Sequence, residues 1–305
     1  MGYPMCTQLR KGLAASTQLH IYDLNTDVLK RFLNEHNDTF IGESPKDVAD
    51  KSDLIITILP EGSHVTTVYL SPETGILSST KSHQIFIDCS TIDPASSKQV
   101  GIAVKQAGRG EFVDAPVSGG TIGAELGTLT FMIGTSADSK LYAQILPVLQ
   151  TMGKNFFACG SPTLGLVTKL ANNYLSGVNA IATSEAMNFA IMHGADPIIL
   201  QRAISVSSGR NFINDVMNPV PGIHPNAPPS KGYQGGFKVQ LMRKDIGLAN
   251  AAAKEVGARM LLGDRVYQVF KEVEKDPRCV NRDNKVVYRF IDGREDVIPG
   301  YFKIE

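Results

Sequence analysis

A lysine stands in an otherwise apolar, helix-forming stretch of the sequence, at position 169. Gly165, Lys169, Asn173 and Gly177 recur every four residues, so a helix would place them along one face. An amine beside an amide, between two positions without side chains, predicts a ledge for a ligand. An amine removed from water has a lowered pKa and exchanges protons near neutral pH, as general acid–base catalysis requires. The alternative is a solvated surface charge, the usual state of a lone lysine on a helix.

An acid at the end of a predicted strand is a second candidate. Met1-Gly2 precedes a helix pattern, a strand follows, and Asp23 comes twenty-one residues after Gly2. In a βαβ unit such an acid would bind the adenosine ribose of NAD and repel the extra phosphate of NADP. The pattern G-x-G-x-x-G is absent, and only Gly2 fits its final position. An Asp at a strand end also commonly begins a turn.

A Gly-rich segment follows another predicted strand, in Asp114-Ala115-Pro116-Val117-Ser118-Gly119-Gly120. A strand that runs into Ser118, Gly119 and Gly120 would leave backbone N–H groups and a hydroxyl at the carboxyl edge of a sheet. Those groups suit a small carboxylate. A plain Gly-rich turn is the alternative.

Three shorter patterns could contribute to a ligand site, but each also has a purely structural explanation. Residues 87–94 place hydroxyls beside a helix start, and the alternative to a ligand there is N-capping by Asp93, with Thr91 as a further candidate. Leu59-Pro60 ends another strand and could simply terminate it. Lys244-Asp245 lies in a helix pattern and could be a surface ion pair.

The elements that must position these residues fall into two kinds. Up to about residue 160, short apolar strands alternate with helices, and Ser44-Pro45 and Asp93-Pro94 are helix starts. This alternation predicts βαβ units and a mainly parallel, doubly wound sheet. The expected strands are Leu19–Tyr22, Leu54–Leu59, Ile85–Asp88, Glu111–Val113, Leu129–Ile133 and Phe156–Ala158.

The second half of the chain has helix patterns and no strand signal. A long helix is expected over Leu164–Met192, another after Asp196-Pro197, and further ones over Leu241–Val256 and Leu262–Lys275, with a Pro- and Gly-rich loop at 218–236. We expect an α/β domain over residues 1–161, an all-helical domain over 162–291 and an unassigned tail at 292–305. Lys169 falls just past that boundary, where ligands of two-domain α/β enzymes collect.

Composition excludes several classes of function. The 305 residues carry 30 basic and 30 acidic side chains, so no basic surface predicts nucleic acid or an anionic membrane as a partner. The apolar runs are too short to span a bilayer. Four cysteines without a C-x-x-C pair, and six histidines without ligand spacing, predict neither a metal site nor a disulfide framework. The sequence shows no signal or transit peptide.

Together these motifs resemble the β-hydroxyacid dehydrogenases, and within them the 3-hydroxyisobutyrate dehydrogenase branch. The resemblance covers residues 1 to about 291. It depends on Asp-Ala-Pro-Val-Ser-Gly-Gly at 114–120, Gly-x-x-x-Lys-x-x-x-Asn at 165–173, Leu-Pro at 59–60, Ser-Thr-Ile-Asp-Pro at 90–94, Asn-Pro-Val-Pro-Gly at 218–222, Tyr-Gln-Gly-Gly-Phe at 233–237 and Lys-Asp at 244–245.

The resemblance implies a Rossmann-type domain followed by an all-helical domain, and a homodimer or homotetramer. It makes Lys169 the catalytic acid–base and places the substrate at Ser118, Gly119, Gly120 and Asn173. It places NAD near Gly2, Asp23, Leu59, Pro60, His64, Thr91 and Lys244. The implied reaction is NAD-dependent oxidation of 3-hydroxyisobutyrate to methylmalonate semialdehyde, a step of valine breakdown. Eukaryotic members act in mitochondria, and the alternative location is the cytoplasm.

The sequence departs from the family at its start, because members begin with a strand and Gly-x-Gly-x-Met-Gly. This chain starts at Met1-Gly2, which matches only the end of that motif, so we expect a Rossmann-type domain without its first strand and weak NAD binding. Two alternatives stay open: a related semialdehyde reductase, for tartronate or succinic semialdehyde, or a non-catalytic homologue that only dimerises. Asp23 disfavours an NADP-preferring reductase, and the motifs at 218–237 favour the hydroxyisobutyrate branch.

Overall fold

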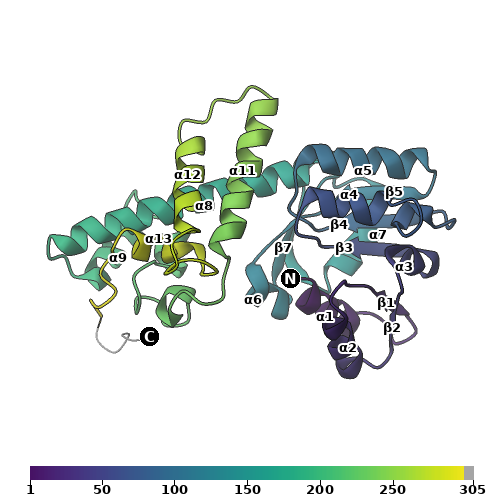
Figure 1. Cartoon of the computed structure of the whole chain (residues 1–305), viewed down its shortest axis with the longest axis horizontal. Helices are drawn as coiled ribbons and strands as arrows, with labels where there is room; N and C mark the ends of the chain where they lie inside the picture. The colour runs from purple at the N-terminus through teal and green to yellow at the C-terminus, as the bar shows by residue number, and fades with distance from the viewer. Residues whose placement is uncertain (299–305) are drawn as a thin grey trace. The chain divides into compact units, whose positions relative to one another are not determined.

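The computed structural model of the chain describes residues 1–298 and divides into two compact units (Figure 1). The first unit is Met1–Lys169 and the second begins at Leu170. The long helix α8, Leu164–Met192, starts in the first unit and continues in the second, with the bounds that the sequence predicted. Lys169 is therefore the last residue of the α/β unit, whereas the sequence placed it in the helical domain.

Strands and helices alternate in the first unit. Its helices are α1 (Gly2–Gly12), α2 (Thr26–Glu35), α3 (Pro45–Lys51), α4 (Gly62–Leu70), α5 (Pro94–Gln106), α6 (Gly120–Glu125) and α7 (Lys140–Leu149). Its strands are β1 (Leu19–Ile21), β2 (Thr39–Ile41), β3 (Leu54–Thr57), β4 (Gln84–Asp88), β5 (Gly110–Asp114), β6 (Val117–Ser118), β7 (Leu129–Ile133) and β8 (Gly153–Ala158).

The strands form three small sheets, where the sequence predicted one mainly parallel sheet. Their orders are β1-β2, β3-β4-β5 and β6-β7-β8, and every pair is parallel except β6 with β7. The sequence missed β2 and β6, which have only three and two residues. Among residues 1–298, no strand pairs with the second edge of β1 or of β3.

Helix starts in this unit follow the capping chemistry read from the sequence. Ser44 accepts a hydrogen bond from the Asp47 backbone N–H, and Asp93 accepts one from Ser96, each with proline at the first helical position. Both predicted caps are confirmed. Thr91 is not the cap of α5.

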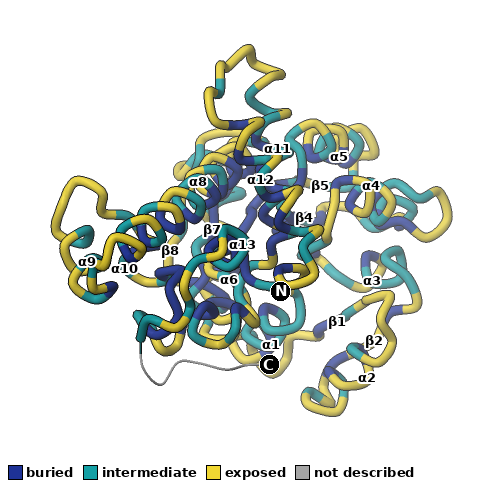
Figure 2. The backbone as a smooth tube through the Cα atoms, turned by 60° about the vertical axis from the view of Figure 1, so that its left-hand side comes forward, coloured by how far each residue is buried: buried dark blue, intermediate teal, exposed yellow. Residues whose placement is uncertain are grey.

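Two apolar clusters hold the first unit together. One joins β4, β5 and β7 to helices α1 and α7 through buried residues such as Ile87, Val113 and Phe131. The other packs α4 and α5 against β3 and β4 through Val65, Val100 and related side chains. Figure 2 shows the buried residues concentrated along strands such as β4 and β7, as expected of strands covered on both faces.

Helices and loops make up the second unit. After α8 come α9 (Pro197–Ser205), α10 (Phe212–Val216), α11 (Val239–Glu255), α12 (Gly263–Val273) and α13 (Val287–Phe290), with short 3₁₀ turns at Pro228–Lys231 and Asn284–Val286. Asp196 caps α9, as predicted. Buried side chains of α8, α11 and α12, including Met242, Ile246 and Phe270, form its main core. None of the helices in residues 1–298 combines the length and the apolar character that a membrane span requires.

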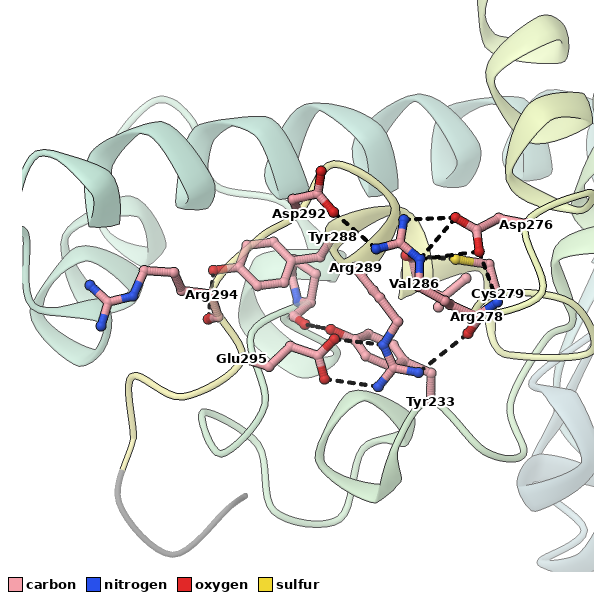
Figure 3. A network of polar contacts seen from close by, with 11 residues as sticks. Tyr233, Asp276, Arg278, Cys279, Val286, Tyr288, Arg289, Asp292, Arg294 and Glu295 are labelled. Carbon is pink, nitrogen blue, oxygen red and sulfur yellow. Dashed lines mark hydrogen bonds and ion pairs between the residues drawn. The ribbon is translucent and has the colours of Figure 1, made fainter. Parts of the chain in front are cut away.

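The C-terminal segment after α13 is part of this unit (Figure 3). The Arg289 guanidinium donates to both carboxylate oxygens of Glu295, at 2.6 and 2.8 Å, and lies 4.8 Å from the Tyr233 ring centroid. Asp292 pairs with Arg278 at 2.9 Å. Residues 292–298, which the sequence left without a role, are therefore tied to the loop that contains Tyr233. Residues 299–305 of the same tail lie outside the described residues.

Candidate active site

Lys169 is buried, with 7% of its surface exposed, which contradicts the reading as a solvated surface charge. It lies in the second turn of α8. The start of that helix is held by the carboxylate of Asp114, the last residue of β5. Asp114 Oδ1 accepts the Thr163 N–H at 2.8 Å, and Oδ2 accepts the Leu166 N–H at 2.9 Å. The helix that carries the lysine thus begins on the carboxyl edge of the sheet.

The two glycines on this face of α8 serve packing, which corrects the prediction of a ledge for a ligand. A Cβ at Gly165 would lie 2.3 Å from the Met132 carbonyl oxygen. A Cβ at Gly177 would lie 2.8 Å from Ile246 Cδ1 and 3.1 Å from Met242 Sδ. Both positions lack a side chain because protein atoms already occupy the space beside them.

Asn173 and Lys244 meet at one buried carboxylate in the second unit. The Asn173 side-chain amide donates to Asp245 Oδ2 at 2.5 Å, and Lys244 Nζ lies 3.2 Å from Asp245 Oδ1. Asp245 is 1% exposed, so Lys244-Asp245 is not the surface ion pair of the simpler reading. The hydrogen bond fixes the orientation of the Asn173 amide one helical turn beyond Lys169 on α8.

Ser118 and the two glycines after it form a short strand and a helix start. Ser118 pairs with Thr130 of β7, and Gly119 has a φ of 134° before α6 begins at Gly120. A Cβ at Gly120, whose φ is 65°, would meet no atom within 4 Å. The space beside Gly120 is therefore open. The carboxylate site that the sequence predicted at this segment stays a prediction.

The ends of β3 and β4 are joined by a buried polar network that the sequence did not reveal. Asp88 Oδ1 accepts hydrogen bonds from Thr57 Oγ1 at 2.8 Å and Ser90 Oγ at 2.6 Å. Ser90 Oγ in turn accepts the Leu59 N–H at 2.8 Å. The network fixes the backbone where Leu59-Pro60 and Ser90-Thr91 leave their strands. Its only sequence signal was an acid at the end of an apolar strand.

The remaining candidates lie at helix starts or loop ends of the first unit. Helix α1 begins at Gly2, where a Cβ would lie 3.2 Å from Ile58 Cγ2, so a larger residue would press on the chain after β3. Asp23 is exposed beyond the end of β1, and its carboxylate accepts the Asn25 N–H at 2.8 Å. His64 is exposed in the first turn of α4.

These positions fit a dinucleotide in outline. Thr57, Asp88 and Asp114 are register partners on β3, β4 and β5, so the segments that follow them leave the same edge of one sheet. Those segments contain Leu59-Pro60, Thr91 and Ser118, and Lys169 belongs to the same unit. The exposed Asp23 carboxylate suits a ribose hydroxyl. Among residues 1–298, no cluster of histidine, cysteine or acidic side chains could hold a metal ion.

Comparison with known proteins agrees with this arrangement. A family model described as the NAD binding domain of 6-phosphogluconate dehydrogenase matches residues 1–160. One described as NAD-binding of NADP-dependent 3-hydroxyisobutyrate dehydrogenase matches residues 164–291. Fold and matches together define an NAD-dependent oxidoreductase with a Rossmann-like domain followed by a helical domain.

Individual relatives narrow this class to a family. The chain is 41% identical to mitochondrial 3-hydroxyisobutyrate dehydrogenase of Mus musculus, over 89% of this chain and 78% of that protein. It is 37% identical to 3-hydroxyisobutyrate dehydrogenase of Pseudomonas aeruginosa, over 88% of each. A solved structure of the Mycobacterium tuberculosis 3-hydroxyisobutyrate dehydrogenase with L-serine matches with a TM-score of 0.84 and 30% identity, covering 95% of both chains. The chain belongs to the 3-hydroxyisobutyrate dehydrogenase family.

Proposed function

We propose that the protein oxidises 3-hydroxyisobutyrate to methylmalonate semialdehyde with NAD⁺, as a step of valine breakdown. The observation that carries the proposal is the burial of Lys169. Its helix begins at the edge of the sheet where β5 ends, and the chain continues from that edge into Ser118-Gly119-Gly120. The names of relatives up to 41% identical support the substrate.

Each residue has a defined part in the proposed reaction. The backbone of Gly119 and Gly120, with the Ser118 hydroxyl, binds the substrate carboxylate, for which the open space at Gly120 leaves room. The Asn173 amide, held by Asp245, orients the substrate. Lys169 accepts the proton of the primary hydroxyl, and in the reverse direction returns it. Bound NAD⁺ would accept the hydride from the carbon that bears this hydroxyl.

Asp23 supports NAD rather than NADP as the preferred cofactor. Its exposed carboxylate follows β1, where it would bind the ribose hydroxyls and repel a 2′-phosphate. Gly2, Leu59, Pro60, His64, Thr91 and Lys244 complete the proposed cofactor set. One matching family model is described by an NADP-dependent enzyme, so kinetics with both cofactors are the decisive comparison.

Replacement of Lys169 tests the mechanism. Lys169→Ala should lower kcat by about 10²- to 10⁴-fold, the usual contribution of a general acid–base, and leave NADH binding within about twofold. The measurements are steady-state oxidation of 3-hydroxyisobutyrate and fluorescence titration with NADH. Lys105→Ala, which changes an exposed lysine on α5, is the control. Unchanged turnover in Lys169→Ala would refute the assignment, and faster turnover of tartronate or succinic semialdehyde with NADPH would favour a related reductase.

We also propose that the protein is a homo-oligomer built through its helical unit. The outer side of α8 exposes Leu175 by 59%, Phe189 by 63% and Met192 by 72%, an apolar surface that favours association. Light scattering after size exclusion should give a dimer or tetramer, and Phe189→Glu should lower its mass. Leu24→Glu, on an exposed leucine of the first unit, should not. A monomeric wild-type protein would contradict this proposal. The names of the eukaryotic relatives support a mitochondrial location.

A further inference from the structure

Asp114 is a buried carboxylate that the proposed reaction does not use. It is 1% exposed at the end of β5, and its two oxygens accept the backbone N–H groups of Thr163 and Leu166 at 2.8 and 2.9 Å. A third contact comes from the Gly165 N–H. Burial raises the pKa of the Asp114 carboxyl, and the backbone hydrogen bonds, those of Thr163 and Leu166 foremost, oppose the rise. The carboxylate therefore takes up N–H groups at the start of a long helix, where no intrahelical partner exists for them.

The fit around this carboxylate is tight on two sides. A Cβ at Gly134 would lie 2.0 Å from Asp114 Oδ1. A Cβ at Gly165 would lie 2.8 Å from Asp114 Oδ2 and 2.3 Å from the Met132 carbonyl oxygen. Because the Met132 carbonyl oxygen is a backbone atom and the Asp114 carboxylate is held by its hydrogen bonds, the first turn of α8 packs closely against β5 and β7.

Thr163 shows that this position costs energy. Its φ is 72°, in the left-handed region that a residue with a branched side chain rarely adopts. The Thr163 N–H donates to Asp114, and its carbonyl oxygen accepts the Val167 N–H at 3.0 Å. Strained backbone of this kind persists where surrounding contacts determine it, and Asp114 makes one of those contacts.

We propose that Asp114 is a positioning residue, which fixes the start of α8 on the sheet and thereby sets Lys169 relative to Ser118-Gly119-Gly120. This inference rests on the proposed function. Leu166, whose N–H binds Asp114, is three residues before Lys169, a rise of about 4.5 Å along a helix. Ser118 is four residues after Asp114 along the chain. Asp114 thus lies between the two: its carboxylate holds the start of the helix that carries the proton-transfer group, and its backbone leads into the carboxylate-binding segment.

Asp114→Asn tests this role with little change of volume. The new amide presents N–H donors to backbone N–H donors, so one hydrogen bond becomes a repulsion and α8 shifts. We expect kcat to fall by about 10- to 100-fold, since misplacement by about 1 Å costs that much, with the KM for NAD⁺ and the NADH dissociation constant within about twofold. Amide hydrogen exchange in residues 163–169 should accelerate. All rates are normalised to the fraction of chains that bind NADH, which removes the effect of misfolded protein.

Two further variants separate positioning from general damage. Gly165→Ala keeps the Asp114 side chain but places a methyl group against the Met132 carbonyl oxygen and Asp114 Oδ2, which displaces the start of the helix, and should reproduce the loss of kcat without loss of NADH affinity. Val167→Ala, which changes an exposed side chain in the same turn, should match the wild type in kcat and in NADH affinity. If Asp114→Asn folds poorly, Gly165→Ala alone decides.

Three results would overturn the proposal. The first is a kcat within about twofold of the wild type in both Asp114→Asn and Gly165→Ala. The second is a loss of NADH affinity in these variants as large as the loss of kcat, and the third is unchanged amide hydrogen exchange in residues 163–169 of Asp114→Asn. Failure of the proposed function looks different, because the wild type itself would then bind NADH and oxidise no hydroxy acid. In that case hydrogen exchange alone decides whether Asp114 holds α8.

Discussion

Asp88 ends β4 inside the protein, and burial raises the pKa of its carboxyl to about 6. The hydrogen bonds from Ser90 and Thr57 oppose this rise, and the charge of Asp114, its register partner on β5, adds to it. The charge of this carboxyl group in turn raises the pKa of Tyr69 and of Cys89, for both of which burial is the larger cause. The other oxygen, Oδ2, has no hydrogen-bond partner among the described residues.

This carboxyl predicts a pH dependence of stability. The folded chain binds the Asp88 proton more tightly than the unfolded chain, where an Asp has a pKa of about 3.9. The contribution therefore favours folding below about pH 4 and is lost as the pH rises through about 6. Relative to Asp88→Asn, the wild-type free energy of unfolding should fall by about 2–3 kcal/mol between about pH 4 and 7. Urea denaturation across this range measures it, and parallel curves would contradict it.

The sequence singled out candidate site residues but not the partners that hold them in the fold. Lys169, Asn173 and Ser118 were visible because their types are unusual in their own elements. Asp114 binds N–H groups 49 and 52 residues away, and Asp245 binds an amide 72 residues away. Such pairs arise only when distant elements pack together, so spacing along the chain cannot reveal them.

At the scale of elements, helices followed the sequence where their ends carried explicit chemistry. Ser44, Asp93 and Asp196 each cap the helix predicted for them, and α8 has its predicted bounds. The short strands β2 and β6 were missed because pairing with a neighbour, rather than their own residues, defines them.

The turn between α5 and β5 offers a matched test of how closely these elements pack. Gly108 has a φ of 61° and open space where a Cβ would be, whereas a Cβ at Gly110, with φ 150°, would lie 1.8 Å from the Gln84 carbonyl oxygen of β4. Gly108→Ala should lower the free energy of unfolding by about 1 kcal/mol, from backbone strain alone. Gly110→Ala should lower it by more than about 3 kcal/mol, because β5 must also leave β4. Chemical denaturation of both variants checks the difference, and equal losses would show that the close contact is unimportant.

At the scale of the whole molecule, the C-terminal segment packs on the apolar core of the helical unit. Val297 packs on an apolar cluster that contains Ile191 of α8, Val220 of the Pro-rich loop and the buried Tyr288. Gly293 lies against the Tyr288 ring, where a Cβ would come within 2.6 Å of ring carbons. The Tyr288 hydroxyl donates to the Arg294 carbonyl oxygen at 3.0 Å. This segment begins just beyond residue 291, where the family match ends, so the resemblance gave no guide to it.

Removal of this segment should therefore destabilise the second unit. A chain ending at Ile291 exposes Tyr288 and leaves Arg289 without Glu295, and should lose about 3 kcal/mol or more of stability. Glu295→Gln alone should cost about 1 kcal/mol, since the pair is partly exposed. Asp296→Asn, in an exposed pair with Arg294, is the control. Urea midpoints measure all three, and a shortened chain as stable as the full one would show the segment to be dispensable.

The small sheet β1-β2 has a consequence for cooperativity. Its three-residue strands pair only with each other in the described chain, so this ribbon can open without breaking a hydrogen bond of β3-β4-β5. Asp23 follows β1, which puts the proposed adenosine contact next to this two-stranded ribbon. A ligand that binds only the closed ribbon stabilises it by mass action. The nucleotide would then act as a folding partner for this corner of the protein as well as a reactant.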